Sequence, residues 1–185
     1  DPSNQILDFV NRFGDRTSTV LGTVGWSYDS RDSYLVPTRG LSQTISAELA
    51  LPVAEQRYYR LRNQTQYFIP LIFKDDSLML QANLGYAAGY GDKPVPFFKN
   101  YYAGGIGSVR GYKDNSLGTQ VLSNDGVSYR SSGGTRSIGV GAEYFAPVPI
   151  TGVDKTFRIS AFPDGGQVWG VNQKVKLVDL RYSAG

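Results

Sequence analysis

The sequence predicts an all-β fold, a transmembrane antiparallel β-barrel, and three observations favour this class. Apolar and polar residues alternate with a period of two in six segments and in the beginning of a seventh. Most of these segments are longer than the ~5–6 residues of ordinary globular strands and match the ~9–11 of tilted membrane strands. The second face of each segment is largely Ser, Thr, Gln, Asn and Gly, which is typical of a confined, wet interior.

The strands can be assigned in order along the chain. They are expected at 19–29, 41–51, 58–69, 77–90, 136–146 and 156–163, with a last one beginning at 178. The alternation predicts which side chains face lipid, namely Ile45, Leu49, Leu80, Leu84 and Val140. It predicts that the lumen is lined by Thr44, Ser46, Gln81, Asn83 and Gly141.

Composition excludes several kinds of site. The 185 residues carry a net charge of +3 and include neither cysteine nor histidine. A thiol nucleophile, a Ser-His-Asp triad and the common zinc sites are therefore excluded, and we predict no metal and no cofactor. The small positive excess is dispersed, so nucleic acid is not an expected partner. No run approaches the ~20 apolar residues of a membrane helix.

Aromatic residues gather near the predicted strand ends, as interfacial girdles do. They include Trp26, Tyr28, Tyr58, Tyr59, Tyr67, Phe68, Tyr86, Tyr90, Tyr144, Phe145 and Trp169. Alternation and aromatic content are also compatible with a soluble β-sandwich rich in aromatic residues. At the level of pattern alone, that alternative stays open.

The connections between strands indicate an orientation. Short segments containing Pro, Gly or Asp lie at 29–40, 70–77 and 146–155 and form every second connection, as periplasmic turns do. On the opposite side, residues 91–135 show no clear alternation, and loops longer than ~12–15 residues are usually functional or disordered. This segment is predicted to be a long outer loop. The other link on that side, at 52–57, is short and supports the orientation less.

The long loop contains the most constrained stretch of the chain, "NYYAGGIGSVRGYKDNSLG" at 100–118. Five glycines surround a single arginine, Arg110, and glycine lets a backbone turn tightly and approach other backbone closely. The alternation places Glu143 opposite Val140 and Ala142, on the Ser/Gly face of its strand. Asp164 has the parity of Ser160, so both carboxylates are expected to point into the lumen.

The stretch "FFKNYYAGGIGSVRGY" resembles the signature of the BamA family of outer-membrane β-barrel assembly proteins, within a wider superfamily of insertases and secretion transporters. Three more blocks fit in order: "YDSRDSYLVPTRG" resembles the family's Asp-x-Arg-Asp…Pro-Thr-x-Gly turn, "GAEYFAPVP" its Glu-bearing strand, and "FPDGGQVW" its Asp-x-Gly strand. The resemblance covers nearly the whole chain.

The resemblance implies that residues 1–185 are the C-terminal portion of a sixteen-stranded barrel, with POTRA domains and seam strands absent. It implies an integral protein of the Gram-negative outer membrane that inserts and folds nascent outer-membrane β-barrel proteins without ATP and without enzyme chemistry. Its partners would be those nascent proteins, outer-membrane lipids and, through the POTRA domains, accessory assembly lipoproteins.

The resemblance also implies a role for the arginine loop, which in the family folds back into the barrel. The expected loop-to-wall motif comprises Val109, Arg110, Gly111, Tyr112, Glu143 and Asp164. A guanidinium has five donors in a fixed fork and can bridge two carboxylates. We expect Gly104, Gly105 and Gly107 to let the loop tip pack close to the wall.

Several alternatives differ from this reading. Arg110 could be a solvated cation, with Glu143 and Asp164 as ordinary lumen charges. The two carboxylates could form a glycosidase pair, although an arginine fixed between them opposes a general-acid role. A passive porin shares the alternation but gives no reason for the Val-Arg-Gly-Tyr sequence. A two-partner secretion transporter or a TamA-type insertase is the closest alternative to an assembly protein.

Overall fold

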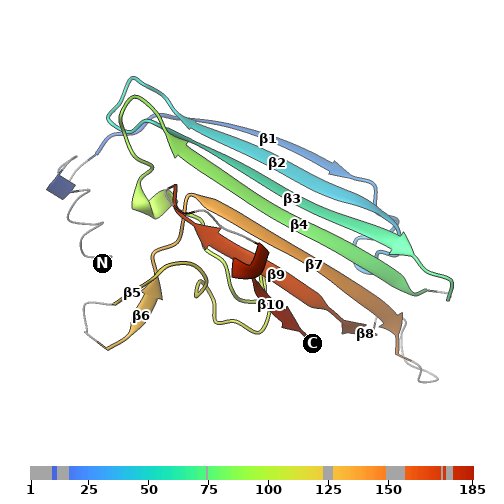
Figure 1. Cartoon of the computed structure of the whole chain (residues 1–185). Coiled ribbons are helices and arrows are strands. Elements are labelled where there is room, and N and C mark those ends of the chain that lie inside the picture. The colour runs from blue at the N-terminus through green and yellow to red at the C-terminus, as the bar shows by residue number, and fades with distance from the viewer. Residues whose placement is uncertain are drawn as a thin grey trace.

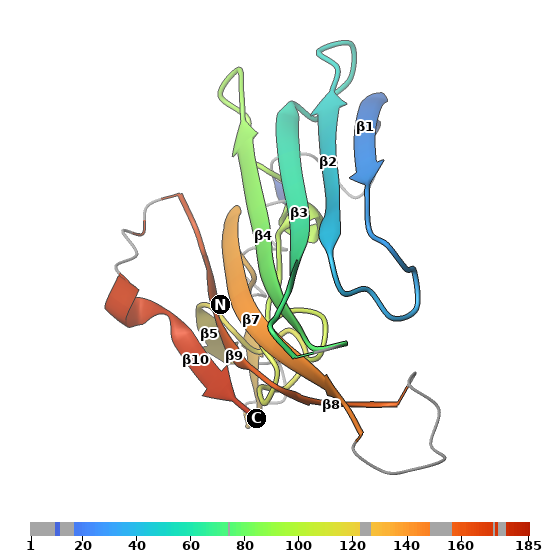
Figure 2. The same cartoon turned by 90° about the vertical axis from the view of Figure 1, so that its right-hand side faces the viewer.

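The computed structural model describes residues 10–11, 17–73, 75–122, 127–148, 157–171, 173 and 177–185. Its main element is one antiparallel sheet in the order β1-β2-β3-β4-β7-β9-β10, with β8 paired to β7 (Figure 1). The strands are β1 Leu21–Asp29, β2 Gly40–Ala50, β3 Tyr58–Pro70, β4 Ser77–Gly89, β7 Arg136–Pro147, β8 Arg158–Ala161, β9 Pro163–Trp169 and β10 Arg181–Ala184. Figure 2 shows that the sheet is curved and open, which confirms the predicted partial, all-β class.

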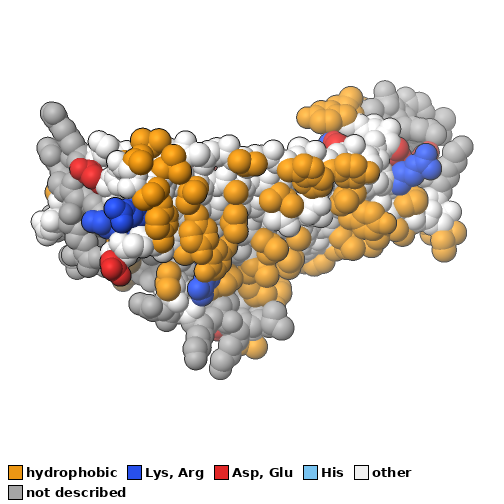
Figure 3. Space-filling model, turned by 90° about the horizontal axis from the view of Figure 1, so that it is seen from above, with side chains coloured by type: hydrophobic (Ala, Val, Ile, Leu, Met, Phe, Trp, Pro, Cys, Tyr) orange, Lys and Arg blue, Asp and Glu red, His pale blue; other side chains and the backbone are white. Residues whose placement is uncertain are grey.

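The two faces of the sheet differ as the alternation predicts. On the outer face, the predicted lipid-facing side chains Ile45, Leu49, Leu80, Leu84 and Val140 are 40–44% exposed. Gln43 and Asn63 share this face and hydrogen-bond to each other. Figure 3 shows hydrophobic side chains spread over this face, with the charged side chains mostly toward the two ends of the strands. On the inner face, Gln81 and Gly141 contact the wall carboxylate Asp164. Within the described ranges, no helix is long and apolar enough to cross a membrane.

Two predicted strands differ in extent from the observed ones. The strand expected at 156–163 continues to Trp169, because β8 and β9 keep one register along β7. They are separated at Phe162, whose backbone exchanges hydrogen bonds with Gly185 at 2.7 and 3.0 Å. The last strand begins at Arg181, since the residues before it form the 3-10 turn η2, Leu177–Asp179.

The connection from β4 to β7 lies on the concave, inner side of the sheet (Figures 1 and 2). It contains the 3-10 turn η1, Phe97–Lys99, and a hairpin of β5, Gln120–Leu122, with β6, Tyr129–Ser131. The hairpin was not predicted, because strands of three residues are too short for alternation to be recognised. A buried apolar cluster joins the connection to the sheet and comprises Ala87, Tyr101, Ala103, Val109, Leu117 and Val168.

The turn between β1 and β2 is held by its own side chains. Arg31 pairs with Asp29 at 2.6 Å, and Asp32 accepts hydrogen bonds from the backbone N–H and the hydroxyl of Thr38 at 2.9 and 2.5 Å. Partial desolvation acts to raise the pKa of Asp32, but the hydrogen bonds from Thr38, together with those from backbone N–H groups such as that of Arg39, outweigh it and lower the pKa to about 2. The predicted turn at 146–155 lies largely outside the described residues.

We expect Thr38→Val to raise the pKa of Asp32 from about 2 part of the way to its ordinary 3.8, because the hydroxyl donor is lost. Since the folded pKa is lowered, ionised Asp32 stabilises the turn above pH 3.8, and this contribution is lost as the pH falls through about 2. Carboxyl NMR titration measures the midpoint. Thr38→Ser keeps the hydroxyl and should keep the midpoint; an unchanged midpoint in Thr38→Val would contradict this account.

Neighbouring residues on β2 test the two faces. Arginine at Ile45, on the outer face, should lower the free energy of unfolding by about 2–4 kcal/mol if the position lies near the bilayer midplane. The same substitution at Thr44, on the inner face, should cost little, because the charge remains hydrated. Refolding titrations in lipid bilayers measure both values, and equal losses at the two positions would count against a lipid-facing outer surface.

Candidate functional site

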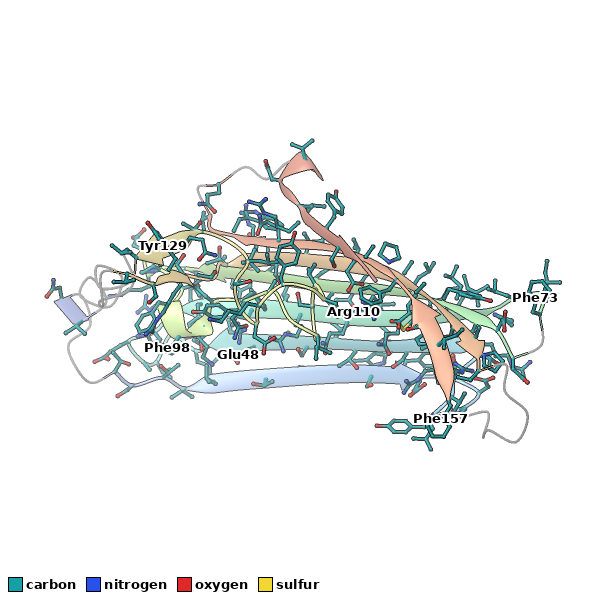
Figure 4. The ribbon with its side chains drawn as sticks, turned by 90° about the horizontal axis from the view of Figure 1, so that it is seen from below. Glu48, Phe73, Phe98, Arg110, Tyr129 and Phe157 are labelled. Atoms are coloured by element: carbon teal, nitrogen blue, oxygen red, sulfur yellow. The ribbon has the colours of Figure 1, made fainter. Side chains whose placement is uncertain are left out.

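Arg110 lies on the inner side of the sheet (Figure 4), and its guanidinium pairs with two carboxylates of the wall. Its Nη1 donates to Glu143 Oε2 on β7 at 2.6 Å. Its Nε and Nη2 donate to the two oxygens of Asp164 on β9 at 2.7 and 2.9 Å, a bidentate pair. The structure thus brings together the loop arginine and both predicted wall carboxylates.

Asp164 is the more fully bonded of the two carboxylates. Besides the guanidinium, it accepts the backbone N–H of Arg110 at 3.2 Å and the side-chain amide of Gln81 at 3.4 Å. The Asp164 side chain is 0% exposed, against 10% for Glu143. A buried carboxylate without partners would be strongly destabilising. The loop therefore supplies most of the hydrogen bonds that stabilise ionised Asp164 on the wall.

One cation facing two carboxylates leaves one negative charge in excess. The backbone N–H of Arg110 and the side-chain amide of Gln81 also donate hydrogen bonds to Asp164. Their dipoles offset part of this excess negative charge. Hydrogen bonding to Asp164, and after it to Glu143, raises the pKa of Arg110 above its ordinary high value. The arginine therefore remains charged at any pH at which the protein is folded.

Phe162 completes the arginine site and was missed by the sequence analysis. The guanidinium carbon of Arg110 lies 3.4 Å from the centroid of the Phe162 ring, a cation–π contact. Phe162 precedes Asp164 by two residues, so both side chains lie on the inner face. The same parity argument that placed Asp164 could have found this ring, because an aromatic side chain among polar inner-face residues needs a partner.

The motif residues on either side of Arg110 contact other parts of the wall. Val109 is 0% exposed and packs in the apolar cluster with Val168 of β9. Tyr112 donates from its hydroxyl to the backbone carbonyl of Tyr182 on β10 at 3.1 Å. Gly111 has a φ of +84°, which favours glycine and turns the chain between these contacts.

Two glycines of the wall make room for the loop. A Cβ on Gly141 of β7 would lie 2.5 Å from Asp164 Oδ1, and one on Gly166 of β9 would lie 2.8 Å from Val109 Cγ2. Any larger side chain at these positions would displace the loop or the carboxylate. The wall therefore has a glycine socket beside each of these two loop contacts.

The loop glycines have a different role from the one predicted. Gly104 and Gly105 have φ values of +107° and +90°, and a Cβ on either would collide with the returning segment of the loop at Lys113 and Asp114. They thus allow the loop to pack on itself and not on the wall. A Cβ on Gly107 would meet nothing within 4 Å, so packing does not require glycine there.

The arrangement does not resemble a glycosidase pair. Such a pair leaves space between its carboxylates for a sugar and a water or a nucleophile. Here the space between Glu143 and Asp164 is filled by the guanidinium of Arg110 and closed on one side by Phe162. The geometry fastens a loop to a wall.

Comparison with known proteins identifies the family. Residues 3–185 match the family model described as the Omp85 superfamily domain. The chain belongs to the Omp85 superfamily. It is 40% identical over 173 residues to the outer membrane protein assembly factor BamA of Neisseria meningitidis serogroup B, an alignment that covers 88% of this chain and 21% of that protein.

The Omp85 assignment extends to three dimensions. The crystal structure of BamA from Haemophilus ducreyi lacking POTRA domains 1–3 matches with a TM-score of 0.76 at 27% identity, over 88% of this chain and 34% of that one. The chain therefore spans a minor part of the relatives it matches. The likenesses confirm the predicted resemblance and make the chain part of an integral β-barrel protein of the Gram-negative outer membrane.

The two wall carboxylates of this Omp85 chain should differ in importance. We expect Asp164→Asn to lower the free energy of unfolding by about 3–5 kcal/mol, the typical loss when one partner of a buried pair is removed. Glu143→Gln should cost less, because Glu143 is more exposed and accepts a single bond from Arg110. Urea titrations of the protein folded in lipid measure both losses. A larger loss for Glu143→Gln would contradict the assigned order.

Proposed function

We propose that this chain is the wall-and-loop segment of a barrel that inserts and folds nascent outer-membrane β-barrel proteins without ATP. The observation that carries the proposal is the fastening of the Val-Arg-Gly-Tyr loop to the inner wall through Arg110, Glu143 and Asp164. Its partners would be the nascent proteins, outer-membrane lipids and accessory assembly lipoproteins. The likeness to an outer membrane protein assembly factor supports an assembly protein over a secretion transporter.

Insertion of a β-barrel into a membrane requires no covalent chemistry. The driving force is the burial of apolar surface in lipid and the pairing of strand edges, and an exposed sheet edge serves as a template for strand addition. A protein that offers such an edge must keep the rest of its wall in one shape while the edge opens. Arg110 and its partners would provide that fixed part of the wall.

Within this function, the loop acts as a brace across the inner side of the sheet. Its tip bonds to β7 and β9 through Arg110 and to β10 through Tyr112. These strands pair directly, so the loop adds side-chain bonds to a backbone ladder that already exists. The added bonds would oppose bending of the wall where the strands meet.

The experiment that tests the function reverses the charge of the loop. In the full-length protein, Arg110→Glu would place three carboxylates together and should abolish most client folding, because like charges in a confined interior repel. Arg110→Lys should be milder but still defective, because an ammonium cannot form the bidentate fork. The readout is the rate at which proteoliposomes containing the full-length protein, and its lipoprotein partners, fold a client barrel.

A compensating pair provides the matched control. Arg110→Glu combined with Asp164→Arg should recover part of the folding rate, and recovery should be partial because Glu143 would still face the new carboxylate. Unchanged client folding by Arg110→Glu in a correctly folded barrel would contradict the proposed role of the loop. If the wild-type proteoliposomes folded no client at all, the assembly function itself would be rejected.

A further inference from the structure

A second group of contacts holds the loop to the sheet at a distance from Arg110. It lies on the arm of the loop, residues 97–101, which precedes the glycine pair at Gly104 and Gly105. Figure 4 shows Glu48 and Phe98 toward one end of the strands and Arg110 further along the sheet. The arm is the first part of the family signature, but neither the Val-Arg-Gly-Tyr motif nor the proposed function assigns a role to it.

Lys99 provides the ionic part of the arm contact. Its Nζ lies 2.8 Å from Glu48 Oε1 on β2, and both side chains are only about a fifth exposed, at 22% and 20%. Glu48 Oε1 also accepts the hydroxyl of Tyr58, on β3, at 2.8 Å. The ammonium of Lys99 lies 5.7 Å from the centroid of the Tyr58 ring, so the tyrosine contacts both members of the pair.

Tyr101 provides the apolar part. Its side chain is buried, and its hydroxyl donates to the backbone carbonyl of Leu61 on β3 at 2.8 Å. The guanidinium carbons of Arg60 and Arg62 lie 4.7 and 5.7 Å from the centroid of its ring. Beneath the ring is Gly85 of β4, where an added Cβ would come within 2.8 Å of the Tyr101 side chain and would also meet the rotatable hydroxyl of Ser137.

The arm and the tip use different strands. The side chains of Lys99 and Tyr101 contact β2, β3 and β4, whereas the tip contacts β7, β9 and β10. The backbone of Tyr101 also exchanges two hydrogen bonds with Gly134, just before β7, and these hold the arm without the tip. Between them lie two residues with positive φ, Gly104 and Gly105, where the backbone can change direction at little steric cost. The two groups are joined through the apolar cluster that contains Tyr101 and Val109, and by one backbone hydrogen bond from the N–H of Leu117 to the carbonyl of Ala103 at 3.0 Å.

We propose that Lys99 and Tyr101 form a second anchor, independent of Arg110, which keeps the arm of the loop on β2–β4 when the tip leaves the wall. Tyr101 is the positioning residue of this anchor, and Gly85 is its socket. Opening of the Arg110 site then moves residues 104–118 about the glycine pair and does not release the whole loop. This inference concerns the loop itself and holds whatever protein the barrel acts upon.

Limited trypsin digestion distinguishes the two anchors, because the chain offers a cleavage site on each. Lys99 reports on the arm and Lys113 on the tip, and cleavage tracks the population of the open form when opening is fast. The full-length protein in outer-membrane vesicles is treated from outside, and peptides are quantified by mass spectrometry. Arg110→Glu should speed cleavage after Lys113 by about tenfold or more and leave cleavage after Lys99 within about twofold of wild type.

The arm variant should give the reverse pattern. Tyr101→Ala should speed cleavage after Lys99 by about tenfold and change cleavage after Lys113 much less, because the bonds of Arg110 persist. Tyr101→Phe keeps the ring and loses one hydrogen bond, so an intermediate rate is expected. Phe98→Ala is the matched control, since this aromatic side chain on the same arm is 52% exposed and should leave both rates unchanged.

Two outcomes overturn the proposal. If Arg110→Glu exposes Lys99 as strongly as Lys113, the loop moves as one unit and has no second anchor. If Tyr101→Ala leaves Lys99 protected, the tyrosine does not hold the arm. Heat-modifiability on gels verifies that each barrel is folded. If Tyr101→Ala does not fold, Gly85→Ala displaces the Tyr101 ring from the wall side and is judged by the same two outcomes.

Discussion

A guanidinium held between carboxylates on two adjacent strands links the long loop to the wall, and the other features of the inner face follow from it. Arg110 neutralises one of the two negative charges that Glu143 and Asp164 bring to a confined interior and donates hydrogen bonds to both, so neither carboxylate could be buried there without the loop. The dependence is mutual, because the loop tip folds on itself through its own backbone hydrogen bonds but is held to β7 and β9 by the bonds of Arg110. Loop and wall are therefore one structural unit.

Glycines on the inner face lower the stability of the strands locally but leave room for the loop. Glycine inside a strand is typically destabilising by about 0.5–1 kcal/mol relative to alanine, yet three inner-face glycines lie beneath loop side chains or beside the carboxylate that binds the loop. Gly85 lies beneath Tyr101, Gly166 beneath Val109, and Gly141 beside Asp164. Each glycine lowers the stability of its strand but permits a close contact at the interface of loop and wall. The contacts made by the docked loop offset this loss of stability.

Features set by a local sequence pattern could be predicted, whereas contacts between distant segments could not. The strands and their two faces follow from alternation, which is why Glu143 and Asp164 could be placed in the lumen by parity. Phe162 obeys the same parity, but a phenyl ring has no charge that would indicate Arg110 as its partner. The contacts of Tyr101 could not be predicted, because they depend on where the loop backbone crosses β3 and β4, and no short-range pattern encodes that crossing.

The bridging of two strands by Arg110 has a consequence for the accuracy of strand pairing. A slip of one residue turns every side chain to the wrong face and is opposed by the lipid, but a slip of two residues preserves the faces and is not. Such a slip moves one strand by ~7 Å along its neighbour, further than a fixed guanidinium fork can follow. Because Glu143 and Asp164 lie on different strands, Arg110 can bond to both in a single register. The bonds of the docked loop thus favour the native pairing of β7 with β9 over a slip of two residues, which the lipid alone does not oppose.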